Sequence, residues 1–75
     1  MNEQELKNYH EIFTDCWKLF KKYSNPVDND EFWMQLKDDA QKIVDKNNNS
    51  KFCRDITKSI ILEIHRLWRA GDNTE

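Results

Sequence analysis

The sequence predicts an all-α protein, a three-helix bundle with up-down-up antiparallel topology. Its 75 residues include one glycine and one proline, which leaves few tight turns to connect short strands. Apolar residues also recur at helical spacing in three segments, at about 3–23, 29–46 and 50–70. A chain of this length has the size of one small domain. We therefore expect residues 1–75 to form a single helical domain with frayed ends at about 1–3 and 71–75.

The first segment is strongly amphipathic. At about 100° per residue, its apolar side chains fall within an arc of about 160°, and lysines and acids fill the opposite arc. We predict that most of this apolar arc is core. Its members are Leu6, Tyr9, Ile12, Phe13, Cys16, Trp17, Leu19, Phe20 and Tyr23.

The other two segments each show one apolar stripe of the width that a three-helix core requires. The second stripe consists of Phe32, Trp33, Leu36, Ala40, Ile43 and Val44. Met34 lies outside it. The third stripe consists of Phe52, Cys53, Ile56, Ile60, Ile64 and Leu67. We expect one residue from each segment, namely Phe20, Leu36 and Ile60, to be buried together.

The joint between the first two segments lies at residues 24–30. Pro26 disfavours the helical conformation for the residue before it, so a break is expected there. Asp28 is followed three residues later by Glu31, which is the spacing of a capping box. The sequence therefore predicts that Asp28 caps the second helix.

The second joint lies at residues 46–50 and contains three consecutive asparagines. Asparagine tolerates the left-handed conformation that a tight helix-to-helix turn requires. Either Asn49 or Ser50 can cap the third helix, since both side chains carry an acceptor oxygen. Gly71 is expected to end that helix.

Charge and composition favour a protein in the cytoplasm. The net charge is −2, with 12 basic and 14 acidic residues, which gives no overall attraction to nucleic acid or anionic lipid. The first residues show no secretory signal pattern, and the longest aliphatic run, at 60–62, is far too short to span a bilayer. Two cysteines in such a chain are expected to be free thiols in a reducing compartment.

No pattern of reactive residues predicts an enzyme. Cys16 and His10 point to separate sides of the first helix, and Cys53 and His65 are about 18 Å apart along the third, so no close pair of zinc ligands exists. Both cysteines lie in or beside apolar stripes, where burial suppresses the thiolate. We expect no catalytic residue, no cofactor and no metal site.

Protein binding is the function that the third segment favours. Ile61 and Trp68 lie together just beyond the core stripe, and Thr57 continues the line. Together with His65 and Arg69 they have the composition of an interaction surface. The partner would be an unidentified protein or a second copy of the chain. In the alternative interpretation Trp68 folds over the open end of the bundle and serves only the core.

Nucleic-acid binding is the second candidate function. Lys51, Arg54, Lys58 and Arg69 share an arc of about 60° on the third helix. A third helix with a basic outer face can enter a major groove. Against this, the second segment is acidic, so the molecule is dipolar rather than basic, and a basic face on a helix is more often simply solvated.

The order "YHEIFTDCWKLFKKY", "DEFWMQL" and "KFCRDITKSIILEIHR" resembles that of short helical proteins encoded in bacterial prophages and other mobile elements. The resemblance covers nearly the whole chain and rests on the aromatic pattern. It implies a small protein that binds a host or phage protein, either as an inhibitor, for example of a defence system, or as an adaptor. It assigns no catalytic residue.

Overall fold

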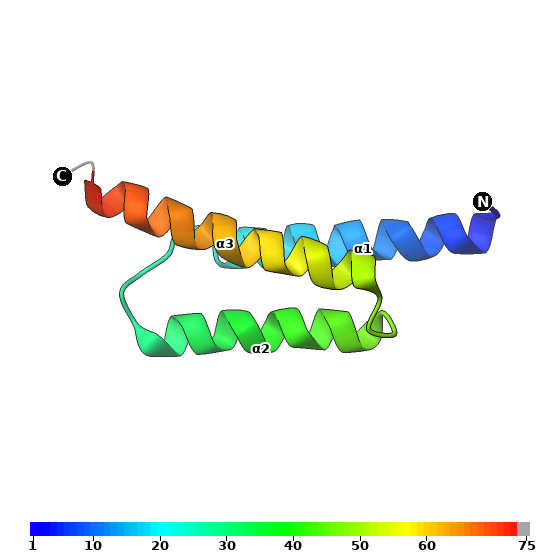
Figure 1. Ribbon diagram of the computed structural model, residues 1–75, viewed down its shortest axis with the longest axis horizontal. Coiled ribbons are helices and arrows are strands. Elements are labelled where there is room, and N and C mark those ends of the chain that lie inside the picture. Colours follow the sequence, from blue (N-terminus) through cyan, green and yellow to red (C-terminus); the bar gives the residue numbers. More distant parts are fainter. Residues whose placement is uncertain (74–75) are drawn as a thin grey trace.

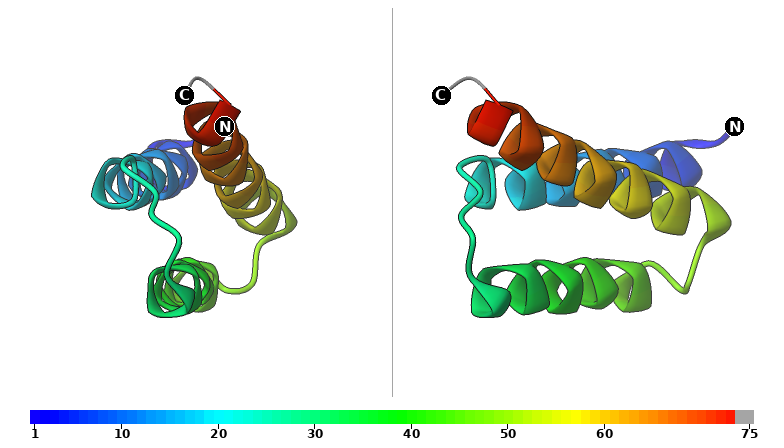
Figure 2. Two further views of the ribbon diagram at one scale, coloured as in Figure 1. Left: turned by 90° about the vertical axis from the view of Figure 1, so that its left-hand side faces the viewer. Right: turned by 60° about the vertical axis from the view of Figure 1, so that its left-hand side comes forward.

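The computed structural model describes the backbone of residues 1–73 and the side chains of residues 1–71. It contains three helices, α1 (Glu3–Lys22), α2 (Asp30–Lys46) and α3 (Lys51–Asn73), and no strand within the described part. The helices run up, down and up, and each packs against the other two (Figure 1). Viewed end-on they form a three-sided bundle (Figure 2). The predicted all-α three-helix fold is confirmed.

The first two helices begin at asparagine caps. Asn2 accepts a hydrogen bond from the backbone N–H of Glu5 at 2.8 Å, and Asn29 accepts one from Glu31 at 2.8 Å. The prediction that Asp28 caps α2 is therefore wrong by one residue. Asn29 has the extended backbone, with φ −149° and ψ 121°, that brings a cap side chain over the free N–H groups of the first turn.

The turn between α2 and α3 uses the asparagines as expected. Asn48 and Asn49 are both left-handed, with φ of 60° and 55°. Ser50 then caps α3, because its hydroxyl accepts a hydrogen bond from the N–H of Cys53 at 3.3 Å. The expected end at Gly71 is wrong: α3 continues to Asn73, and Gly71 does not adopt the positive φ that ends a helix. Residues 74 and 75 of the expected frayed end lie outside the described residues.

The core consists of two buried clusters. The first comprises Leu19, Tyr23, Leu36, Ala40 and Ile64, and the second comprises Ile12, Cys16, Val44 and Cys53. Ile43 and Ile60 pack against both clusters and so join them. Leu36 is completely buried, and Phe20 and Ile60 pack against its cluster in partly buried positions. The three residues lie in one cluster as predicted, but only Leu36 is fully buried.

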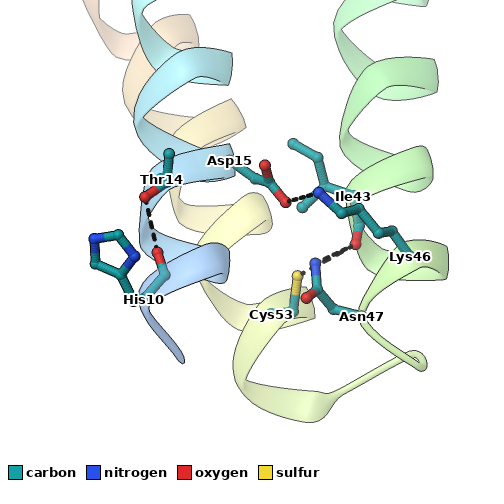
Figure 3. A network of polar contacts seen from close by, with 7 residues as sticks. All are labelled: His10, Thr14, Asp15, Ile43, Lys46, Asn47 and Cys53. Atoms are coloured by element: carbon teal, nitrogen blue, oxygen red, sulfur yellow. Dashed lines mark hydrogen bonds and ion pairs between the residues drawn. The ribbon is translucent and has the colours of Figure 1, made fainter. Parts of the chain in front are cut away.

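The helices are staggered along the bundle axis. Asp15 forms an ion pair with Lys46, at the end of α2, at 3.0 Å (Figure 3). Farther along the same seam Lys22 pairs with Asp39 at 2.8 Å. Since α1 and α2 are antiparallel, these pairs place α2 beside only the second half of α1. The first turns of α1 project past the α2–α3 turn, and residues 1–10 are all exposed (Figure 1). The molecule is accordingly long and narrow, 49 × 21 × 17 Å.

None of the helices within residues 1–73 combines the length and the apolar character of a membrane span.

Candidate functional site

The largest departure from the predicted core is a row of exposed apolar side chains on α1. Leu6 is 62% exposed, Phe13 57%, Trp17 61% and Tyr9 37%. We call these four residues, together with the partly buried Phe20, the aromatic stripe. All five were expected in the core. The structure instead buries the adjacent stripe of α1, formed by Ile12, Cys16, Leu19 and Tyr23.

The width of the apolar arc of α1 explains this exposure, and the stagger of the helices adds to it at Leu6. The apolar arc of α1 is about 160° wide, but α2 reaches only its second half and α3 begins beside Tyr9 and Phe13. Nothing within the described residues therefore covers the far side of the arc. One signal in the sequence could have indicated this: an arc of 160° is wider than the stripes of the other two helices, although all three share one small core.

Aromatic contacts hold the stripe against α3. Tyr9 and Phe13 each form a T-shaped ring pair with Phe52, with ring centroids 5.2 Å apart for Tyr9 and 5.7 Å apart for Phe13. Trp17 stacks beside Phe20 at 6.5 Å. Such ring pairs each add about 0.5–1.5 kcal/mol beyond area burial, which fixes the exposed rings in place. The stripe is thus an ordered surface and not a set of loose side chains.

A shallow groove of 490 Å³ continues the stripe onto α3. Its walls are largely apolar. They are formed by Phe20, Phe52, Asp55, Ile56, Ser59, Ile60 and Glu63. The two acids at its rim are held by neighbours on their own helix, Asp55 by Lys51 at 2.7 Å and Glu63 by Arg66 at 2.6 Å. The combined surface therefore has an apolar centre and a charged edge, which is the usual composition of a protein interface.

The opposite flank of α1 has a different character, because ion pairs close it against α2. Lys22 and the Tyr23 hydroxyl both donate to Asp39, and they hold the pKa of that carboxyl below its usual range. Lys46 donates to Asp15 and its own pKa is raised by that bond. Among the described residues, ion pairs between helices join only α1 and α2. The contact between α1 and α3 is instead formed by apolar and aromatic side chains.

The residues predicted to bind a partner lie elsewhere. Trp68 is half-buried against Trp33 of α2, with ring centroids 5.7 Å apart, and His65 lies beside both rings at 5.6 Å and 5.5 Å. Ile61 is half-buried against the first core cluster, and Arg69 is exposed. Trp68 thus covers the end of the α2–α3 seam, as the alternative interpretation expected, and a role in partner contact stays a prediction.

Thr57, which was expected to extend that surface, is buried. Its hydroxyl donates within α3 to the carbonyl oxygens of Cys53 and Arg54, both at 3.0 Å. This satisfies the buried hydroxyl without any partner from another helix, so threonine can occupy a core position here. Helix α3 therefore contributes less free apolar surface than the sequence suggested, and α1 contributes more.

The basic residues of α3 are all exposed, but they do not form one site. Lys51 is engaged by Asp55, and Arg69 lies about 16 Å beyond Lys58 along the helix. Arg54 and Lys58 line a groove of 390 Å³ between α2 and α3 together with Lys37. This groove gathers positive charge from two helices, a combination that the sequence did not predict.

Both cysteine thiols are buried in the core. Burial, followed by the nearby Cys53 thiol and the Asp15 carboxylate, raises the pKa of the Cys16 thiol to about 11. Burial also raises the pKa of Cys53, whose Sγ lies 3.8 Å from the Ile43 carbonyl oxygen (Figure 3). Within the described residues, no group of His, Cys, Asp and Glu could hold a metal ion.

Comparison with known proteins adds no further constraint: no family model, no curated protein and no solved structure matches the chain.

Proposed function

We propose that this protein is a non-enzymatic protein-binding module and that the aromatic stripe of α1 is its binding surface. The observation that carries the proposal is the exposure of Leu6, Phe13 and Trp17, each more than half exposed, in one row. Contiguous apolar surface of this kind on a small protein marks interaction sites. Tryptophan and tyrosine are also the residues that most often dominate binding energy.

The setting that we propose is the cytoplasm. Both cysteines are free and buried, which suits a reducing compartment. The resemblance to small proteins of prophages and mobile elements suggests an adaptor or an inhibitor that binds a host or phage protein. The physical features of the stripe fit either role, since both need an exposed apolar surface on a stable scaffold.

The test is affinity capture with matched variants, with bound proteins identified by mass spectrometry. The bait is the intact chain, carrying either Phe13→Ser or, as the control, Leu62→Ser. Leu62 is 60% exposed and lies on α3, so the control removes an equally exposed side chain away from the stripe. We expect a protein that the parent and the control retain and that Phe13→Ser loses. Equal recovery with all three baits would refute the proposal.

Nucleic-acid binding is the second candidate. It is favoured by the groove at which Lys37, Arg54 and Lys58 converge from two helices. The same capture, carried out without nuclease, decides between the two: recovery of nucleic acid that depends on Arg54 and Lys58, rather than on Phe13, supports the alternative.

A further inference from the structure

We infer that the occupant of the aromatic stripe is a second copy of this chain, with the two α1 helices antiparallel and crossing at Phe13. The inference rests on the proposed function and names the partner of the same surface. Three features of α1 carry it: the spacing of the stripe, the projection of its first turns, and the distribution of its charges.

The spacing of the stripe is symmetric. Its residues follow one another at intervals of three, four, four and three, so Phe13 is the centre. When a second α1 is placed antiparallel with a two-fold axis at Phe13, Leu6 of one copy faces Phe20 of the other. Tyr9 then faces Trp17, and the two Phe13 rings face each other. Every apolar side chain of the stripe meets an apolar side chain, as a self-complementary interface requires.

The projecting turns of α1 make the helix long enough to pair with a second α1 along the whole aromatic stripe. Residues 1–10 are exposed and reach past the α2–α3 turn, so Leu6 has little cover within its own chain (Figure 1). In the antiparallel pair each projecting segment lies along the second half of the other α1. There it covers Trp17 and Phe20, which stack on each other at that end of the stripe. The first turns of each copy thus cover the far end of the stripe on the other copy.

The charges on α1 favour the antiparallel direction. Glu3 and Lys21 are 18 residues apart, which is five full turns, so they share one flank of the stripe. They lie ten residues before and eight residues after Phe13, so Glu3 of one copy comes within about 3 Å, along the axis, of Lys21 of the other. In a parallel pair this flank would lie on opposite sides of the seam in the two copies, so Glu3 would meet no lysine. Lys7 of one copy and Lys18 of the other also come level in the antiparallel pair, but they lie about 40–60° farther round the helix, where solvent screens their repulsion.

The size of the surface suits a reversible dimer. With about 200 Å² for a large side chain, the four exposed residues of the stripe present roughly 400 Å² per copy. The pair would bury roughly 800 Å² of apolar surface, and Phe20, Phe52 and the charged flank would add to it. Specific interfaces begin at about 1,200 Å² in total. The apolar side chains alone therefore fall below that limit, the flanking contacts are needed to approach it, and we expect weak association that depends on concentration.

The first experiment is sedimentation equilibrium of the intact chain over a wide concentration range. The expected mass rises from 9.2 kDa toward twice that value. A dimer of Phe13→Ser lacks the central ring in both copies, so its dissociation constant should be at least about tenfold higher. The control Leu62→Ser should change it less than about twofold. Melting of the dilute monomer should be unchanged for Leu62→Ser and should fall only modestly for Phe13→Ser, which loses its ring contact with Phe52.

The second experiment tests the direction by charge reversal at low ionic strength. Glu3→Lys or Lys21→Glu alone should raise the dissociation constant by roughly three- to tenfold, and the double variant should restore it, because opposite charges again face each other. In a parallel dimer this flank would lie on opposite sides of the seam in the two copies, and Glu3 and Lys21 would be far apart along it, so the single reversals would change the dissociation constant little. That result would overturn the antiparallel arrangement.

Two other outcomes separate this inference from the proposed function. If the parent chain stays at 9.2 kDa at millimolar concentration, the dimer is refuted. The proposed function then survives if a different protein is captured in a Phe13-dependent manner. If the chain dimerises but Phe13→Ser has no effect on the dimer or on capture, the aromatic stripe is not a binding surface and both proposals fail.

Discussion

The Tyr23 hydroxyl donates a hydrogen bond to Oδ2 of Asp39 at 2.5 Å and thereby joins the end of α1 to the middle of α2. Lys22 donates to the same oxygen at 2.8 Å. The Tyr23 side chain is buried and packs edge-on against Phe32 at 5.2 Å. This contact joins α1 and α2 at one end of their seam, and the ion pair between Asp15 and Lys46 joins them at the other.

The first prediction concerns the pH dependence of this contact. The folded state lowers the pKa of Asp39 below 3.8, so the carboxylate stabilises the fold above that pH and loses its effect as the pH falls through the lowered value. Asp39→Asn should therefore be less stable than the parent in urea at pH 6, and the difference should shrink in strong acid. A difference that is the same at both pH values would contradict this role.

The second prediction concerns the core. Leu36 is completely buried, so Leu36→Ala should lower the free energy of unfolding by about 2–5 kcal/mol. Met34 is on the same helix but 65% exposed, and Met34→Ala should change stability by less than about 0.5 kcal/mol. Urea denaturation of the two variants and the parent provides the measurement. Similar midpoints for both variants would mean that the apolar stripe of α2 is wrongly assigned.

A third prediction distinguishes the two interpretations of Trp68. Since its ring packs against Trp33, Trp68→Ala should lower stability by about 2 kcal/mol and leave association per folded molecule unchanged. Ile61→Ser should behave in the same way, because Ile61 packs against the core. Melting and sedimentation of both variants test this. Lost association with an unchanged melting temperature would instead support the contact surface of Ile61, His65, Trp68 and Arg69.

The fourth prediction concerns the basic residues of α3. We expect no nucleic-acid binding at near-physiological salt that survives competitor of scrambled sequence, because the chain carries a net charge of −2. Fluorescence anisotropy at several salt concentrations provides the measurement. Affinity that falls steeply with salt and disappears in the double variant Arg54→Glu, Lys58→Glu would favour the nucleic-acid function.

The fifth prediction concerns the thiols. With its pKa raised to about 11, Cys16 is almost entirely protonated at pH 8, and both cysteines are buried. A thiol reagent should therefore react slowly with the native chain and rapidly with the chain in urea, because only the unfolded state offers exposed thiolate. Rapid reaction of the native protein at pH 8 would show that the core opens near Cys16 or Cys53.

The sequence by itself determined the three helices and most of the buried stripes. Helix periodicity is a local property, so Leu36, Ala40 and Ile64 could be assigned to the core from spacing alone. The turn at Asn48 and Asn49 was also predictable, because asparagine tolerates the left-handed backbone that both residues adopt. Errors at the helix ends, such as Asp28 in place of Asn29 as the cap, were of one to three residues.

Only the tertiary structure decided which part of each apolar arc is covered. Periodicity indicates the direction in which a side chain points, but it does not indicate how far along the bundle the neighbouring helix reaches. Lys46, the last residue of α2, lies beside Asp15, so Leu6 is beyond the reach of that helix, whereas Trp68 is covered by Trp33. The candidate site moved from α3 to α1 because exposure depends on how the packed helices cover one another, which is a long-range property of the chain.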